Sequence, residues 1–431
     1  MSGAFVWPAC YPVAMITKFQ SVGSIIRANP RGWLIVLFIF AALSLVFSAR
    51  MTLSVIMPTW EEELGWARTF IATGGSVVLI FMTLISPLAG NLLDRVGPRP
   101  VVAGALLCVG AALAATSMMT EQWQFILLFC IIGGLGFGAL AAPQASATIG
   151  QIFDEHRGLA TGIATSGASG GLLIILPVLA VMIGWIGWRA SFVGFGLIIM
   201  AMAPLAWFLI TPASRISNAW AGGGSAALSA RLRLITRNST FWLLLGGFMI
   251  CGFTTTGVIE VHLIPYAISC GFPRVESATA LGVLSAFNMG GMILAGYLAD
   301  KVNRPLLLGA IYFLRALTFF ILMNITGNPE LLFLFAILFG IFDYSAMPVL
   351  ASIVSTHIGV GVMGLTLGLL FAGHSAGAAA GAFMGGYFFD AFASYEWVWI
   401  VSIALAMMAA VVTWMIKEPR DTEQAGTRVP A

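Results

Sequence analysis

Long apolar stretches, separated by short polar ones, follow one another along most of this chain. A helix needs about 20 apolar residues to cross a bilayer, and twelve stretches are of that order. The predicted helices cover 33–58, 70–93, 99–118, 124–149, 158–184 and 188–211, and then 240–268, 276–299, 305–325, 330–353, 361–386 and 396–416. The pattern predicts an all-α membrane protein with six spans on each side of a polar middle segment.

The polar positions outside these helices divide the chain into five segments. We expect an N-terminal tail (1–32), a first six-helix bundle (33–211), a basic flexible linker (212–239), a second six-helix bundle (240–416) and a C-terminal tail (417–431).

Composition supports a membrane protein. Hydrophobic residues make up 60% of the chain and charged residues 9%, whereas an average soluble protein has about 25% charged residues. The five cysteines are scattered, and we find no metal-ligand spacing, no nucleotide-binding loop and no nucleophile–base set. We therefore expect no metal, no cofactor, no nucleic acid partner and no enzymatic activity. The partners that remain are a solute and the lipid bilayer, and we expect a monomer.

The basic residues predict an orientation in the membrane. If both termini are cytoplasmic, fifteen of the 20 Lys and Arg residues lie on the cytoplasmic side, and three (Arg68, Arg189 and Arg274) lie outside. Positive charge is retained on the cytoplasmic side of membranes. The asymmetry predicts a multi-pass protein of the bacterial inner membrane with both termini in the cytoplasm.

A charged motif occurs twice, near the end of the second predicted helix of each half. The first copy reads Gly90-x-x-x-Asp94-Arg95-x-Gly97-x-Arg99, and the second reads Gly296-x-x-x-Asp300-Lys301-x-x-Arg304. Gly90 and Gly296 are 206 positions apart, nearly half of the chain. Such self-similarity is typical of a transporter built from two parallel repeats.

This motif resembles the loop motif of the major facilitator superfamily, which lies between helices 2 and 3 and again between helices 8 and 9. The resemblance implies two six-helix bundles around a central cavity, and transport by alternating access. Within the superfamily the chain is similar to bacterial relatives of monocarboxylate porters and oxalate–formate antiporters. The second copy is one residue shorter and lacks the inner glycine, and helix 8 lacks the Asp/Arg pair of monocarboxylate porters.

The motif residues are predicted to form a cytoplasmic gate. Asp94 ends one helix near the start of the next, where it can cap a neighbouring helix N-terminus and pair with a basic residue of the other half. A charge-assisted bond of this kind is worth roughly 1.5–3 kcal/mol and would bias a two-state equilibrium. The predicted gate residues are Gly90, Asp94, Arg95, Gly97, Arg99, Asp300, Lys301 and Arg304.

Six ionisable residues inside the predicted spans are the main functional candidates. They are Arg50, Glu260, His262, Arg315, Asp343 and His374. A charge in mid-bilayer costs at least about 2.5–3.5 kcal/mol, so these side chains should face a cavity or one another.

Two alternatives stay open for several of them. Arg315 either holds a substrate carboxylate or neutralises Asp343 on the next helix, and we favour the pair. Asp343 would then be the partner of Arg315 in the first place and a proton carrier in the second. Arg50 either binds the anion or pairs with Glu260. His374 is a packing residue, a substrate ligand or a proton-coupling site, for which its ordinary pKa near 6.5 is suited. Glu260 and His262 lie two apart on a helix and point to different faces.

Weaker candidates are uncharged. Asn288 and Gln144 could donate hydrogen bonds to a substrate. Together these features predict a secondary active transporter of a small organic anion, a monocarboxylate, by proton symport or anion exchange. The alternative is a drug or metabolite exporter that works by proton antiport, although helix 5 lacks the Gly-Pro pair of such exporters, since Ala168 follows Gly167.

Overall fold

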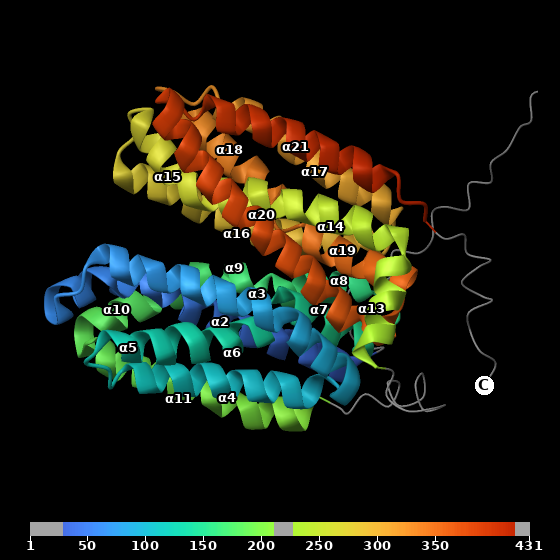
Figure 1. The fold of residues 1–431 in the computed structure, drawn as a ribbon, viewed down its shortest axis with the longest axis horizontal. Helices are drawn as coiled ribbons and strands as arrows, with labels where there is room; N and C mark the ends of the chain where they lie inside the picture. Colours follow the sequence, from blue (N-terminus) through green and yellow to red (C-terminus); the bar gives the residue numbers. More distant parts are fainter. Residues whose placement is uncertain (1–28, 211–226, 419–431) are drawn as a thin grey trace, which may run out of the picture.

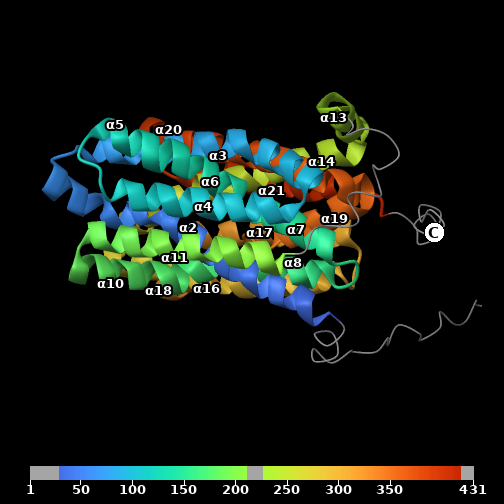
Figure 2. The ribbon, with the colours of Figure 1, turned by 90° about the horizontal axis from the view of Figure 1, so that it is seen from below.

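The structure is a computed structural model that describes residues 29–210 and 227–418, which form helices and no strand. Most of both predicted tails and the first part of the linker lie outside these residues. Figure 1 shows the spans lying side by side in two groups, with helix α13 (Leu228–Arg237) at one end. Figure 2, turned by 90°, shows α13 at the same end. We call it the α13 end.

The first group contains the six spans predicted for the first half. They are α2 (Pro30–Leu64), α3 (Arg68–Val96), α4 (Pro98–Thr116), the span of α5 (Gln122–Phe125), α6 (Gly134–Ala139) and α7 (Ala142–Ile152), the span of α8 (Arg157–Thr165), α9 (Gly167–Gly170) and α10 (Leu176–Ile186), and α11 (Trp188–Leu209). Short π-helical segments, Ile126–Gly133 and Gly171–Ile175, interrupt the fourth and fifth spans.

The second group contains the other six. They are α14 (Ser239–Gly252) continued by a π-helical segment (Phe253–Ile259) and α15 (Glu260–Ser269), then α16 (Arg274–Ala299), α17 (Arg304–Leu322), α18 (Pro329–Phe342) with α19 (Ala346–Val354), α20 (Met363–Phe392) and α21 (Glu396–Trp414).

The count of twelve depends on a reversal at Gly359. Eleven helical stretches among the described residues are long and apolar enough to span a membrane, and one of them, Pro329–Phe392, has 64 residues. At about 1.5 Å per residue, such a helix would be far longer than the roughly 30 Å hydrocarbon layer. Gly359 has a φ of +114°, which breaks the helix between α19 and α20. The stretch is therefore two spans, and the predicted twelve-helix fold in two bundles is confirmed.

Local sequence signals fix the helix starts at the α13 end. Gly97, with a φ of +87°, makes the turn between α3 and α4. The second motif copy uses a different device, since the side chain of Asn303 accepts a hydrogen bond from Leu306 N at 2.8 Å and caps α17. Pro98 and Pro305 then occupy first-turn positions, where a missing N–H costs nothing. The shorter second copy therefore still forms a tight turn.

Part of the predicted flexible linker is helical. In α13 the side chains of Arg231 and Ile235 are buried, 4% and 0% exposed. Ile235 joins an apolar cluster of the second half. Leu228, Leu232 and Ile235 are spaced four and three residues apart, which places them on one face of a helix and favours an amphipathic helix once that face finds a packing surface.

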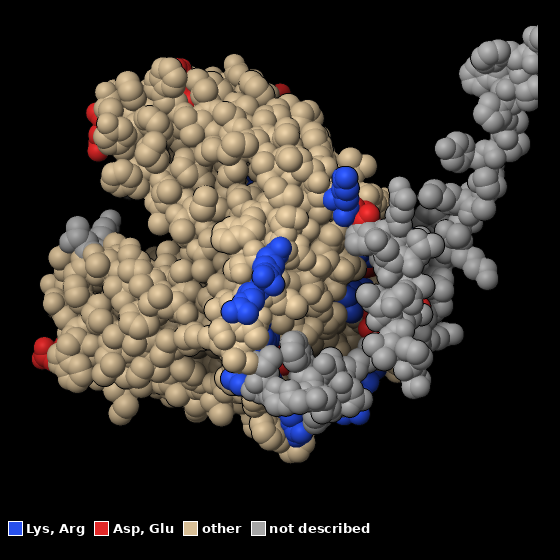
Figure 3. Space-filling view, turned by 45° about the vertical axis from the view of Figure 1, so that its right-hand side comes forward, with Lys and Arg blue, Asp and Glu red and all other residues tan. Residues whose placement is uncertain are grey.

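The two bundles meet at the α13 end and separate at the other. One buried cluster at the α13 end contains Leu93, Val101 and Ala147 of the first half together with Val362 and Met363 of the second. A second buried cluster lies at the opposite end of the molecule. Among the described residues, its buried members all belong to the second half. Figure 3 shows a deep notch between two lobes on the side away from α13. We call this notch the central cleft.

Candidate functional site

Two aspartates join the two halves at the α13 end in the same way. The Asp94 carboxylate accepts hydrogen bonds from Gly364 N and Leu365 N, both at 2.8 Å. The Asp300 carboxylate accepts hydrogen bonds from Gly158 N at 2.7 Å and Leu159 N at 2.9 Å. Each aspartate thus caps a helix of the other half, α20 or α8, where free N–H groups and the helix dipole favour a negative charge. The cap that we expected at Asp94 is present, and its function as a gate stays a prediction.

Paired glycines bring these helices into backbone contact. A Cβ at Gly90 would collide with the carbonyl of Gly364, and one at Gly296 would collide with the carbonyl of Gly158. The same relation holds in the reverse direction for Gly364 and Gly158. The first glycine of each motif copy therefore permits the close approach that lets the aspartate reach its cap.

Arg231 is a residue of this site that the sequence did not reveal. Its Nη2 forms an ion pair with Asp94 Oδ2 at 2.7 Å and donates to Gly361 O at 3.1 Å, and its Nη1 donates to Asn91 Oδ1. In the sequence, the only feature that pointed to Arg231 was the basic character of the predicted linker (212–239). One guanidinium from α13 thus joins α3 of the first half to the turn before α20 of the second.

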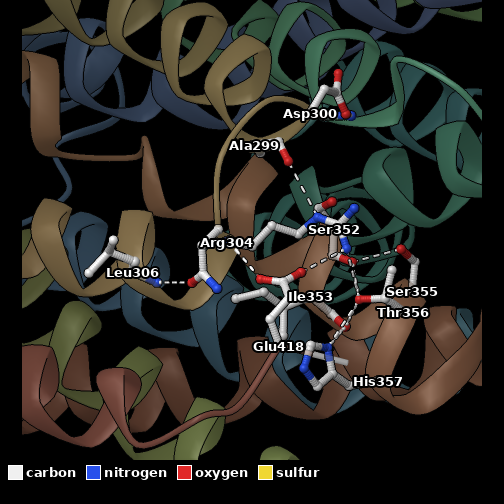
Figure 4. A network of polar contacts seen from close by, with 12 residues as sticks. Ala299, Asp300, Arg304, Leu306, Ser352, Ile353, Ser355, Thr356, His357 and Glu418 are labelled. Atoms are coloured by element: carbon white, nitrogen blue, oxygen red, sulfur yellow. Dashed lines mark hydrogen bonds and ion pairs between the residues drawn. The ribbon is translucent and has the colours of Figure 1, made fainter. Parts of the chain in front are cut away.

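Three other basic motif residues contact side chains of their own half. Arg99 lies over the Trp207 ring at 4.3 Å, and Lys301 lies 5.6 Å from the Tyr297 ring. Arg304 forms an ion pair with Glu418 at 3.2 Å and donates to Thr356 Oγ1 at 3.2 Å (Figure 4). Arg95 is in the last turn of α3. The contacts of Arg99, Lys301 and Arg304 described above stabilise one bundle each rather than the seam between the bundles.

Burial changes the acidity of Asp300, which lies just beyond α16. Desolvation raises the pKa of its carboxyl. The hydrogen bonds from Leu159 and Gly158, and the charges of His156 and Arg304, oppose that rise. The closed arrangement therefore favours the protonated carboxyl more than water would.

Arg315 is fully buried between α17 and α18, and its partners differ from the expected ones. We predicted an ion pair with the Asp343 side chain. Instead its Nη2 donates to the backbone carbonyls of Phe342, at 2.6 Å, and Asp343, and its Nη1 lies 3.0 Å from Cys251 Sγ. The helix is interrupted at Asp343 (φ −61°, ψ −85°), which leaves carbonyl groups free to accept the guanidinium.

The Asp343 carboxylate is held by Asn288 instead. Asn288 Nδ2 donates to Asp343 Oδ2 at 3.0 Å, and both residues are 3% exposed. Asp343 Oδ1 and Asn288 Oδ1 are buried without a hydrogen-bond partner. Asn288 is therefore engaged with Asp343, and the free carboxylate oxygen can take up a proton.

Arg50 lies where the two bundles face each other. Its guanidinium lies over the Phe47 ring at 4.4 Å and contacts Met82 Sδ at 3.9 Å. Glu260 and Tyr344 of the second half are within electrostatic range. No hydrogen bond or ion pair to an acid is present among its described contacts. The predicted alternative of direct pairing with Glu260 is therefore not seen in this conformation.

Glu260 is exposed although it belongs to a membrane span. Its Oε1 accepts a hydrogen bond from Tyr344 OH at 2.7 Å, and Tyr344 OH lies 2.9 Å from Thr256 Oγ1. The π-helical segment Phe253–Ile259 ends directly before Glu260, and such segments are frequent at functional sites. Glu260 and Arg50 thus line the central cleft from opposite halves.

The remaining candidates are buried side chains with defined neighbours. His374 is 4% exposed and packs against the rings of Phe371 at 5.9 Å and Phe248 at 4.6 Å. His262 Nε2 lies 3.0 Å from Ala382 O. Gln144 Nε2 donates to the Ser86 carbonyl at 2.9 Å, so this amide joins α7 to α3.

Comparison with known proteins gives consistent matches. The sequence profile of the Major Facilitator Superfamily matches residues 39–359 and 293–430. The chain is 26% identical over 398 residues to YcxA, an uncharacterized MFS-type transporter of Bacillus subtilis, covering 90% of this chain and 95% of that protein. It is 26% identical to human monocarboxylate transporter 11, covering 88% and 82%. The crystal structure of the Escherichia coli fucose:proton symporter FucP superposes with a TM-score of 0.69 at 17% identity, covering 89% and 99%.

Proposed function

The chain belongs to the major facilitator superfamily, a family of membrane transporters, and on that premise we propose that it moves a small organic anion, a monocarboxylate, by alternating access. Movement of the anion is coupled to proton symport or to exchange for another anion. Similarity to a monocarboxylate transporter supports this substrate class.

The observation that carries the proposal is the position of Arg50. It is a permanent cation in a membrane span, at the seam between the halves, whose described contacts are a ring and a thioether rather than an acid. A guanidinium binds a carboxylate with two parallel hydrogen bonds. An incoming carboxylate would therefore find a cation that needs no prior partner to leave. Phe47 and Met82 would contact the carbon skeleton of the anion.

The two ends of the molecule take different parts in the cycle. We assign the α13 end to the cytoplasm, in line with the distribution of Lys and Arg. In the conformation described, Asp94, Asp300 and Arg231 close that end, and the central cleft opens on the other side. Release of these contacts would open the cytoplasmic side, and each ligand shifts the equilibrium only by its differential affinity for the two states.

Proton coupling is assigned to the buried pair of Asp343 and His374. The Asp343 carboxylate has one buried oxygen without a hydrogen-bond partner, and His374 is a buried side chain of the same bundle. Both groups lie close to the cleft-lining Tyr344, whose ring is 6.5 Å from that of His374. A proton bound at Asp343 or His374 would be transported in the same alternating-access cycle as the anion bound at Arg50.

Uptake by purified protein in proteoliposomes tests the proposal. Arg50→Gln should abolish uptake of monocarboxylates, and Arg50→Lys should retain part of it, since a point charge remains. Arg189→Gln is the matched control, because this arginine stacks on Trp188 at 4.2 Å at the opposite end. Normal uptake by folded Arg50→Gln would refute the anion site.

A further inference from the structure

Glu260 is a negative charge on the wall of the central cleft that anion binding at Arg50 leaves without a cationic partner. It is exposed within a span, and it acts electrostatically on Arg50 across the seam, yet no hydrogen bond or ion pair joins the two among their described contacts. Charges inside membrane spans are expensive and mark substrate or ion pathways. An anion at Arg50 would neutralise Arg50 and leave Glu260 as it was.

The surroundings of Glu260 suit a cation. Tyr344 OH donates to Oε1 at 2.7 Å, and Thr256 Oγ1 lies 2.9 Å from that hydroxyl. No hydrogen bond to the other carboxylate oxygen, Oε2, is present among the described residues. An ionised carboxylate only accepts hydrogen bonds. The hydroxyl network therefore fixes one oxygen and leaves the second available to a donor in the cleft.

The aromatic ring of Tyr344 lies next to this carboxylate, because its hydroxyl is bonded to Oε1. The His374 ring follows at 6.5 Å from the Tyr344 ring. The faces of aromatic rings attract ammonium groups within about 6 Å, and quaternary ammonium ligands are bound in this way. A carboxylate beside the Tyr344 ring is an environment for a substituted ammonium rather than for a second anion.

The entrance to the cleft also disfavours a plain anion, because acidic residues outnumber basic ones there. The segments at the end opposite α13 carry eight acids, Glu61, Glu62, Glu63, Glu121, Glu276, Glu330, Asp390 and Glu396, against three arginines, Arg68, Arg189 and Arg274. Figure 3 shows red acidic atoms at the far ends of both lobes. A rim of one sign raises the local concentration of ions of the opposite sign. This entrance would repel a simple anion, whereas an acid that also carries a positive group has no net charge and would not be repelled.

We propose that Glu260, Tyr344 and Thr256 form a subsite for an ammonium group, and that the substrate is a zwitterion, an amino or betaine-type carboxylic acid. The inference rests on the proposed function, because the carboxylate of the same molecule is bound by Arg50. Such a substrate neutralises both charges of the cleft. It also bridges the two bundles, so its binding favours their approach on the open side.

Matched pairs of ligands test the subsite. Binding to the purified full-length protein is measured for 3-phenylpropanoate against phenylalanine, pentanoate against 5-aminopentanoate, and acetate against glycine betaine. In at least one pair the ammonium-bearing acid should bind about tenfold tighter or more, the size expected for one charged hydrogen bond. Glu260→Gln should remove this preference while it leaves the plain acid unchanged or tighter. Glu276→Gln, at the rim of the opposite end, should keep the preference.

Three outcomes separate this inference from the proposed function. If Arg50→Gln weakens both members of a pair but Glu260→Gln weakens neither, the anion site stands and the ammonium subsite is refuted. If plain acids bind the wild type as tightly as their ammonium partners in every pair, the subsite is likewise refuted. If no carboxylate binds, or if Arg50→Gln has no effect, the proposed function fails and this inference fails with it.

Discussion

Arg231 and Asp94 form a buried ion pair of 2.7 Å between residues 137 positions apart, at the seam where the two bundles meet. The guanidinium is 4% exposed and the carboxylate 0%. Asp94 also caps α20, so α13 and both bundles converge on one carboxylate. Helix α13, which the sequence presents as part of a linker, therefore helps to hold the two bundles together at this end.

Removal of Arg231 should destabilise the closed α13 end. Arg231→Ala leaves a buried carboxylate without its counter-charge, and loss of one member of a buried pair costs about 3–5 kcal/mol. Distances between spin labels on the two bundles at this end should therefore shift to longer values. Arg233→Ala, an exposed position of the same helix, should leave them unchanged. Unaltered distances in Arg231→Ala would show that the pair does not hold the seam.

The contact between Gly296 and Gly158 should be sensitive to a single methyl group. Gly296→Ala places a Cβ against the Gly158 carbonyl, and forced overpacking costs typically 1–3 kcal/mol. We expect slower transport and less of the closed state. Gly290→Ala on the same helix is the control, since a Cβ there meets nothing within 4 Å. Equal uptake by the two variants would contradict the close approach.

Acidification of the α13 end should favour its closure through Asp300. In the closed state desolvation raises the pKa of this carboxyl. Once the end opens to water, the pKa should return toward the ordinary aspartate value of about 3.9. The closed state therefore binds more protons, so its advantage is complete below that value and is lost as pH rises through the raised pKa.

This dependence can be measured with spin labels on the two bundles at the α13 end, where the fraction of molecules at the short, closed distance should fall as pH increases. Asp300→Asn should flatten the profile. His156 and Arg304 are the charged groups that act on this carboxyl, so His156→Gln serves to separate the contribution of the histidine. A profile that persists in Asp300→Asn and disappears in His156→Gln would assign the effect to the histidine.

Asp343→Asn should uncouple protons from transport. The amide keeps the shape of the side chain next to Asn288 but cannot be ionised. Uptake driven by an imposed pH gradient should be lost, while exchange of substrate across the membrane continues. Asp390→Asn, exposed at the opposite end, should keep both activities. Retention of pH-driven accumulation in Asp343→Asn would exclude this residue as the proton site.

The twelve spans could be predicted because lipid imposes a length and a composition on each of them. The cap at Asp94 could be predicted because the motif places an acid at the end of one helix, close to the next. The hydrogen-bond partners of Arg315 could not be predicted from the sequence. The helix break at Asp343 lies in Phe342-Asp343-Tyr344, without a proline or glycine at that point to mark it, and only this break exposes the carbonyls that the guanidinium uses.

Tertiary contacts account for the other omissions. Tyr344 gave no periodic signal, and its position became informative only through hydrogen bonds to Glu260 and Thr256, 84 and 88 residues away. Arg231 lies in a segment whose Gly and Ser content favours a flexible chain, so its burial depended on a surface formed by α3 and α14. Asn288 could not be assigned to Asp343 rather than to a substrate, because the spacing of side chains along one helix does not fix which neighbour they meet.

The duplicated glycine–aspartate contact has a mechanical consequence. One copy joins α3 to α20, and the other joins α16 to α8. A tilt of one bundle that broke only the first contact would therefore still be resisted by the second. Opening of this end would require both contacts to break. We expect a conformation in which only one of them is broken to stay closed to protons and ions.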